Sequence, residues 1–252
     1  MDDYCNTMEK SKIQTLYDAC NAIFSQKDLP TFKQIQWLKK LIDSFEAIDV
    51  GIDELGSCGS PCRSPKGLIC GQDISITYIH IHECEEFSIG VFCMPAGVTF
   101  PLHDHPGMTV FSKLLYGSVY TKAYDWIKSY KSSASQKFGV ASKVIDGIWT
   151  APCETSVLFP RSGGNIHSFT ALTSSAVLDV LTPPYSEELG RPSTYFSDYP
   201  IVSLPGYAML EERSLPDDLV VIGAPYLGPL LDDGDGDGDR DVDDSGGDHN
   251  TL

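Results

Sequence analysis

The sequence predicts a mainly β protein, a closed antiparallel barrel or jelly roll preceded by two helices. The main observation is a series of short segments that alternate apolar and polar residues or have the composition of strands. These segments are 74–82, 87–92, 109–116, 118–124, 156–159, 166–172 and 176–181. Turn-forming residues separate them at short spacings, and no helical pattern intervenes, which favours antiparallel strands over a sheet of alternating strands and helices.

Two helices are expected before the barrel. Apolar residues from Ile13 to Phe24 recur at offsets of 0, 3, 4, 7, 10 and 11, which places them on one helix face. Thr31 and Gln34 have the spacing of a capping box, and a second apolar stripe follows as far as about Phe45. Because such stripes usually form core contacts, we expect segment 1–50 to pack on the barrel.

The rest of the chain divides by composition. Residues 51–71 are rich in Gly, Ser, Pro and Cys, which predicts a loop. Residues 72–228 hold the barrel and a C-terminal extension, with a mobile loop at 127–139 and a last helix or strand at 207–213. Residues 229–252 are low in complexity and acidic, so a disordered tail is predicted.

Charge and hydropathy exclude two classes of partner. The formal net charge is −17, and from Leu231 onward there are nine Asp against one Arg. Binding of nucleic acid needs clustered Lys and Arg, so it is not expected. No apolar run approaches the ~18 residues that span a bilayer, and the acidic N-terminus does not resemble a secretory signal. These features predict a soluble protein inside the cell, where its eight cysteines stay thiols.

A metal site is indicated by His103 and His105. Side chains at i and i+2 of a strand point to the same face, so both imidazoles can reach one ion. Neutral imidazole binds Fe, Zn, Cu or Ni, so the residue type does not name the metal. His80 and His82 have the same spacing but no comparable surroundings, and we expect them to be structural or exposed.

The surroundings of His103 and His105 resemble the first motif of the cupin superfamily. Gly97, the HxH pair and Gly117 have the spacing of that motif, whereas Val110 stands where it usually has a metal-binding glutamate. Residues 160–167 resemble a degenerate second cupin motif, which makes His167 the third ligand; His249, in the predicted tail, is the other late histidine. The resemblance implies a cupin double-stranded β-helix with a metal held by three histidines.

Three histidines without a carboxylate are typical of thiol dioxygenases among cupins. Segments 86–96, 101–110, 162–167 and 178–185 resemble the plant cysteine oxidases, which are relatives of animal 2-aminoethanethiol dioxygenase, and the resemblance extends from about residue 35 to 228. It implies an enzyme that uses Fe(II) and O2, with no organic cofactor, to convert the N-terminal cysteine of proteins to cysteine sulfinic acid. The implied substrates are group seven ethylene-response transcription factors and similar Cys-initiating proteins.

The same resemblance implies a biological setting and two further site residues. Oxidation would mark the substrates for degradation through the Cys/Arg N-degron pathway, so a monomer in the cytoplasm and nucleus would act as an oxygen sensor in the hypoxia response. Asp179 would orient the substrate amine or a ligand, and Tyr185 would hydrogen-bond near the bound oxygen or sulfur. Arg191-Pro192-Ser193 departs from the family, whose corresponding segment often carries His and Cys.

Alternatives remain open at this point. Cys58, Cys62, Cys70 and Cys84 could suggest zinc, but their spacing does not match common zinc sites. Residues 233–244 match most positions of an EF-hand loop, yet position 12 is Asp244, so weak nonspecific divalent binding is preferred. The other functions are a cupin dioxygenase of a small thiol and a non-enzymatic metal-binding cupin that serves as an interaction module.

Overall fold

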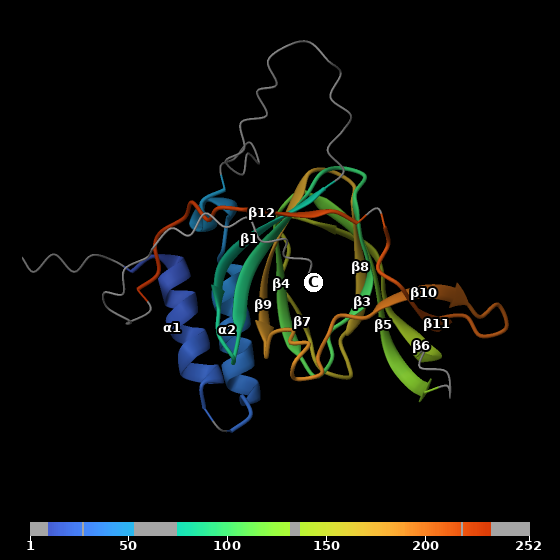
Figure 1. Ribbon diagram of the computed structural model, residues 1–252. Coiled ribbons are helices and arrows are strands. Elements are labelled where there is room, and N and C mark those ends of the chain that lie inside the picture. Colours follow the sequence, from blue (N-terminus) through green and yellow to red (C-terminus); the bar gives the residue numbers. More distant parts are fainter. Residues whose placement is uncertain (1–9, 27, 53–74, 132–136, 218, 233–252) are drawn as a thin grey trace, which may run out of the picture.

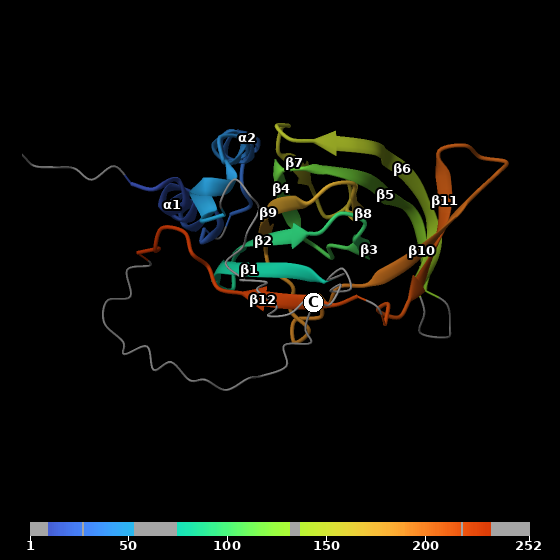
Figure 2. The same ribbon diagram turned by 90° about the horizontal axis from the view of Figure 1, so that it is seen from above.

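The computed structural model describes residues 10–26, 28–52, 75–131, 137–217 and 219–232. Two β-sheets face each other, and two helices pack on the outer face of one sheet (Figures 1 and 2). This architecture confirms the predicted fold class, a mainly β barrel of the cupin type with N-terminal helices. Most of the predicted loop, residues 53–71, and most of the predicted tail, 233–252, lie outside the described residues.

The helices form where the apolar stripes predict them. Helix α1 spans Lys12–Phe24, helix α2 spans Phe32–Asp43, and a short 3-10 turn, η1, follows at Ala47–Val50. The capping box of α2 is present, because the Thr31 hydroxyl accepts a hydrogen bond from the Gln34 amide while the Gln34 side chain accepts one from the Thr31 amide. Such a cap satisfies two backbone donors that the helix itself leaves unpaired.

The first sheet has six strands in the order β12–β1–β2–β9–β4–β7. Its strands are β1 (Ile76–Glu83), β2 (Ser88–Met94), β4 (Thr109–Tyr116), β7 (Ser156–Leu158), β9 (Ser175–Thr182) and β12 (Val221–Ala224). All neighbours are antiparallel except β1 and β12, which are parallel, with Ile76 opposite Val221. The sequence did not predict β12, which brings the C-terminal extension back to the start of the barrel.

The second sheet has the order β10–β11–β6–β5–β8–β3 and closes where Tyr195 pairs with His103. Its strands are β3 (Thr99–Asp104), β5 (Ser118–Lys131), β6 (Lys137–Thr150), β8 (Ile166–Ala171), β10 (Tyr195–Pro200) and β11 (Tyr207–Arg213). Segment 207–213, expected to be a helix or a strand, is therefore a strand. Each predicted strand has a counterpart in one of the two sheets.

The prediction of a loop at 127–139 is wrong at both ends. Strands β5 and β6 continue as a hairpin ribbon in which Ser129 pairs with Gly139 and Tyr130 with Phe138. Two exposed apolar side chains, Ile127 and Phe138, lie on this ribbon. The Lys- and Ser-rich sequence of this segment lacks the alternation that marks a half-buried strand, so it predicted a loop.

The helices cover the six-stranded sheet and share a core with it. Ile13, Leu16, Leu38 and Ile42 are fully buried, and each such side chain contributes about 1.5–3 kcal/mol relative to exposure. The sheet residues in this core come from β1, β2, β4 and β9 and the turn before β2: Ile79, Phe87, Ile89, Val91, Phe111, Leu178 and Val180. The stripes are therefore packing faces, as expected.

A second core lies between the two sheets. It combines Ile76, Met94 and Val177 of the first sheet with Phe100 and Phe169 of the second. These side chains are all buried, so they fix the distance between the sheets. Beside them lies a cavity, and β3, β8, β9 and the segments that follow β3 and β9 carry the predicted site residues into it.

Candidate metal centre

The second sheet brings His103, His105 and His167 together. His103 on β3 is directly opposite His167 on β8, and His105 follows β3 by one residue. All three side chains are buried, and one potential ligand nitrogen from each lies within 4.8 Å of the others. The pairing of β3 with β8 therefore creates the cluster, although 62 residues separate His105 from His167 in the chain.

Hydrogen bonds at the far side of the rings orient the histidines. His103 Nδ1 is 2.8 Å from the Pro101 carbonyl oxygen, and His105 Nδ1 is 2.7 Å from the Tyr185 hydroxyl, which itself donates to the Asp104 carbonyl. These contacts place protons on Nδ1 and lone pairs on Nε2. The Nε2 atoms of His105 and His167 are 3.4 Å apart, so the His105 lone pair points toward the ring of His167.

The electrostatics of the cluster suit a divalent cation. Burial lowers the pKa of His103 to about 4 and holds the pKa values of His105 and His167 well below the ordinary value. Three neutral imidazoles whose nitrogens lie this close together can all donate lone pairs to one metal ion. The cluster is thus a buried three-histidine metal-binding site, and the donors fit Fe, Zn, Cu or Ni.

Val110 explains why the site lacks a carboxylate. It lies on β4, is 1% exposed and packs against Met108 and Leu158. An apolar side chain thus occupies the position where the cupin motif usually has its glutamate. With three neutral ligands the metal keeps its full charge and favours an anionic ligand.

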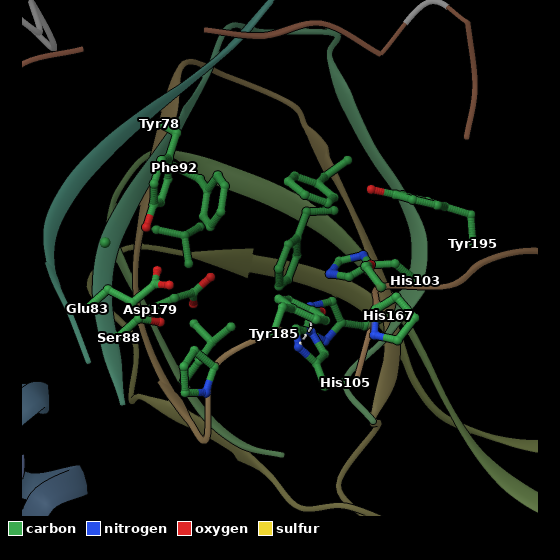
Figure 3. Close-up of a pocket in the computed structure, with 18 of the residues that line it drawn as sticks. Tyr78, Glu83, Ser88, Phe92, His103, His105, His167, Asp179, Tyr185 and Tyr195 are labelled. Atoms are coloured by element: carbon green, nitrogen blue, oxygen red, sulfur yellow. Dashed lines mark hydrogen bonds between the residues drawn. The ribbon is translucent and has the colours of Figure 1, made fainter. Parts of the chain in front are cut away.

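The cluster forms one side of a cavity of about 260 Å³. Figure 3 shows the histidines on one side and Asp179, Glu83 and Ser88 on the other. The wall between them is largely apolar and includes Phe92, Met94, Phe100, Phe169, Val177 and Leu181. The cavity therefore combines a metal-binding side, an apolar wall and an acidic side.

Asp179 on β9 is the buried charged group of the acidic side. Its register partners are Gly90 on β2 and Ser112 on β4, and the Ser112 hydroxyl donates to its carboxylate. Burial raises its pKa to about 7, while the hydrogen bond from Ser112 opposes that shift. Its Oδ1 atom is buried without a partner among the described residues. A buried acceptor in this condition indicates a ligand with a donor or a positive charge.

Gly90 allows a tyrosine to lie beside Asp179. A Cβ atom at Gly90 would be 2.5 Å from the ring of Tyr78, so any larger residue would displace that ring. Tyr78 lines the cavity. Its pKa is raised to about 12, mainly by burial and to a smaller extent by the negative charges of Glu83 and Asp179. Its neutral hydroxyl therefore belongs to the acidic side of the cavity.

The other candidates are placed apart from this site or outside the described residues. His80 is exposed, and the ring of His82 packs on Tyr17 and Phe87, so both have the expected structural or exposed character. Cys58, Cys62, Cys70 and the EF-hand-like segment 233–244 lie outside the described residues. The side chain of Arg191 donates a hydrogen bond to the Pro184 carbonyl at 3.3 Å.

Sequence reasoning found five residues of the cavity and missed others. His103, His105, His167, Asp179 and Tyr185 all line it. Tyr78, Glu83 and Ser112 were not predicted. Strand register places these three residues at the acidic side. One signal in the sequence could have found two of them, because Tyr78 and Glu83 lie in the strand that carries the HxH pair at 80–82.

The barrel and this site define a class, the cupins that hold one metal ion on histidines. The PCO_ADO family model matches residues 41–231, which is most of the chain. Plant cysteine oxidase 1 of Arabidopsis thaliana is 40% identical over 88% of this chain and 80% of its own length, and plant cysteine oxidase 2 is 39% identical over 87% and 83%. The chain therefore belongs to the PCO/ADO family of thiol dioxygenases.

Further similar proteins include an animal enzyme and a solved structure. The 2-aminoethanethiol dioxygenase of Mus musculus is 30% identical over 82% of this chain and 89% of its own length. Among solved structures, an RmlC-like cupin from Desulfovibrio desulfuricans covers 48% of this chain and 97% of its own, with 19% identity and a TM-score of 0.29. Within the described residues, no helix is both long and apolar enough to span a membrane.

Proposed function

We propose that this protein is an Fe(II)-dependent dioxygenase that converts the N-terminal cysteine of proteins to cysteine sulfinic acid. The reaction joins both atoms of O2 to the sulfur, so R–SH and O2 give R–SO2H. Sulfur loses four electrons and O2 gains four, and no further reductant is required. The similarity to plant cysteine oxidases 1 and 2 supports this proposal.

The observation that carries the proposal is a single cavity with a metal-binding side and an unsatisfied buried carboxylate. Its volume of about 260 Å³ is small beside the ~300–1,000 Å³ of typical ligand pockets. Such a cavity suits the first residue of a peptide better than a longer segment. An N-terminal cysteine offers a thiol to the metal and an ammonium group to Asp179.

At the metal-binding side the chain supplies neutral ligands and an apolar wall. The bound ion would stabilise a thiolate and offer open positions for ligands. His103, His105 and His167 contribute no negative charge, so attraction for a thiolate is not reduced. Phe100 and Phe169 line the same cavity and exclude water from the reacting sulfur.

At the acidic side the chain is arranged to bind a cation. Apart from histidines, the charged side chains among the described cavity residues are Glu83, Asp179 and Glu187, all of them acids. Binding of an α-ammonium group would satisfy Asp179 Oδ1 and stabilise the ionised carboxylate. An acetylated terminus offers no such charge, so the free amine should be required.

The family resemblance extends the proposal to substrates and setting. The substrates are group seven ethylene-response transcription factors and other Cys-initiating proteins, whose oxidation feeds the Cys/Arg N-degron pathway. A monomer in the cytoplasm and nucleus would thereby report oxygen during the hypoxia response.

A second candidate substrate is a small thiol that carries an amine. The relative from Mus musculus is named 2-aminoethanethiol dioxygenase, and 2-aminoethanethiol has both groups that the cavity accommodates. The two proposals differ in what leaves the cavity, because a peptide continues outward whereas the small thiol ends inside.

Mass spectrometry of peptides tests the proposal. Fe(II)-loaded protein is incubated in air with a Cys-initiated peptide, with its acetyl-capped form and with 2-aminoethanethiol. We expect the free-amine peptide alone to gain two oxygen atoms efficiently. Faster oxidation of 2-aminoethanethiol would favour the small-thiol enzyme, and no oxidation of any thiol by iron-loaded protein would contradict both.

A further inference from the structure

The turn before β8 is tied to two of the three histidines. Gly163, Gly164 and Asn165 form this turn, and both glycines have positive φ angles, of 84° and 86°. A Cβ atom at Gly164 would lie 2.6 Å from that of Ala123, so the turn is packed directly against β5. The turn connects His167, two residues later, with the backbone of His105.

The side chain of Asn165 clamps the main chain of His105. Its Oδ1 accepts a hydrogen bond from the His105 amide at 3.2 Å, and its Nδ2 donates to the His105 carbonyl at 2.8 Å. Nδ2 also donates to the Phe159 carbonyl at 3.0 Å. Asn165 is 6% exposed, and these three bonds use most of its hydrogen-bonding capacity. His105 is a loop residue beyond the end of β3, so this clamp replaces the ladder bonds of a strand.

Asp125 on β5 fixes the turn itself. One carboxylate oxygen, Oδ1, accepts hydrogen bonds from the amides of both Gly164 and Asn165, each at 2.9 Å. The backbone of Gly164 in turn hydrogen-bonds to the ring of His167. Asp125 therefore acts on His167 through Gly164 and on His105 through Asn165.

We propose that Asn165 and Asp125 are positioning residues of the metal centre, which hold His105 and His167 in the relative orientation that binds the metal. Neither side chain belongs to the metal-capable cluster or lines the main cavity, so their effect is exerted through the two ligands. Residues that orient metal ligands typically contribute about 10–100-fold to metal affinity. The inference concerns the metal site on which the proposed function depends, but it does not require that a thiol be oxidised.

The test measures metal affinity in the full-length chain without any thiol. Fe(II) binding under anaerobic conditions is followed by competition with a chromogenic chelator, and Co(II) absorption reports the ligand geometry. We expect Asn165→Ala and Asp125→Ala to weaken binding by about 10–100-fold and to change the Co(II) spectrum. Asp125→Asn should remain close to wild type, because its amide oxygen can accept both backbone bonds.

Matched controls separate positioning from stability. Asn21→Ala removes an exposed asparagine of α1, and Asp146→Ala removes a carboxylate of β6 that bonds to Lys143 and Tyr120. Both should leave metal affinity unchanged. Thermal unfolding of each metal-free variant shows whether it folds. If Asn165→Ala does not fold, the metal affinities of Asp125→Ala and Asp125→Asn are compared instead, and they test whether the turn positions the ligands.

Unchanged Fe(II) affinity and Co(II) spectrum in folded Asn165→Ala or Asp125→Ala would overturn the inference, even if the unfolding temperature fell. So would an Asp125→Asn variant as defective as Asp125→Ala. Wild-type protein that binds Fe(II) tightly but oxidises no thiol would contradict the proposed function and leave this inference standing.

Discussion

The two sides of the cavity differ in how fully their polar atoms are satisfied. On the metal-binding side, hydrogen bonds to Nδ1 orient His103 and His105, and one ring nitrogen of each of the three histidines lies within 4.8 Å of the others. On the acidic side, Asp179 has one hydrogen bond from Ser112 and an Oδ1 atom with no partner among the described residues. The first side is preorganised for a metal ion, whereas the second is incomplete until a ligand binds.

This difference separates two functions that share one cavity. Metal retention should depend on the metal-binding side and should be unaffected by substitutions at the acidic side. Recognition of the substrate amine should depend on the acidic side and should be unaffected by substitutions at the metal-binding side. The predictions below test that separation.

The largest expected effect follows loss of a ligand. His167→Ala should lower metal retention by more than the ~100-fold that loss of an outer-shell partner costs, because two imidazoles remain. Metal content after desalting measures it. His82→Ala removes an imidazole that packs on Tyr17 and Phe87 and should retain the metal. Normal metal content in the His167 variant would show that His167 is not a ligand.

The next effect concerns Asp179. Asp179→Asn should lower kcat/KM for a Cys-initiated peptide by about 30-fold or more, since it removes one partner of a buried charge pair. Its metal content should stay normal, and Asp146→Asn, on the outside of β6, should have little effect. An Asp179 variant that oxidises the peptide at the wild-type rate would break the assignment of the acidic side to the amine.

The raised pKa of Asp179 predicts pH dependence with a defined sign. Its pKa is about 7 in the folded protein against 3.8 ordinarily, so the stability it contributes is full below pH 3.8 and is lost as the pH rises through about 7. Metal-free Asp179→Asn should therefore gain about 1–3 kcal/mol over wild type at pH 8 but not at pH 4. Denaturant unfolding at the two pH values measures this difference; an equal difference at both would contradict it.

Activity should show the complementary dependence. Below about pH 7 a protonated Asp179 no longer attracts the ammonium group, so kcat/KM should fall as the pH is lowered. Tyr78 and Glu83 face the same side of the cavity, and the pKa of Tyr78 lies too high to contribute to this change. The decrease in kcat/KM at low pH should disappear in Asp179→Asn. If the decrease persists in that variant, a different group titrates.

A smaller effect is expected from Tyr185→Phe. The variant keeps the ring beside His105 but loses the hydroxyl that bonds to His105 Nδ1, so metal affinity should fall by about tenfold. Chelator competition measures it, with Tyr199→Phe, an exposed tyrosine of β10, as the control. If metal affinity is unchanged while kcat falls, Tyr185 acts on the bound oxygen or sulfur, as the family resemblance implied.

The smallest effect should come from Glu83, which lines the cavity but is exposed. An exposed ion pair is worth about 0.2–1 kcal/mol, so Glu83→Gln should raise KM for the peptide by about 1.5–5-fold at low salt. Added salt should reduce the difference. Glu85→Gln, two residues along the chain, is the matched control, and equal effects of the two variants would remove Glu83 from the binding site.

Much of this fold could be predicted because its signals are local. The stripe from Ile13 to Phe24, the Thr31 capping box and the alternation of 74–82 each report one face of one element. The hairpin ribbon at 127–139 and strand β12 carry no such signal. The ribbon has the exposed apolar side chains Ile127 and Phe138, and β12 has only four residues, none of them polar, with Ile222 exposed. Periodicity reports burial on one face, and neither segment alternates apolar and polar residues.

The site divides in the same way. The spacing around His103 and His105 was visible in the sequence, and the family resemblance supplied Asp179 and Tyr185. The roles of Tyr78, Ser112 and Asn165 depend on which residues become neighbours across strands and turns. Ser112 meets Asp179 only because β4 and β9 pair in one register, and a shift by one residue would turn Asp179 away from the cavity.

The short strand β12 has a consequence for association between molecules. The six-stranded sheet ends in strands of four and three residues, β12 and β7, while the second sheet closes on itself. Short edge strands offer little unpaired backbone for another chain to join. Strand β12 also covers β1, which carries Tyr78 and Glu83. A chain truncated before Val221 would leave the edge of β1 unpaired. Self-association through that edge would then compete with the packing of β1 that places Tyr78 and Glu83 at the acidic side.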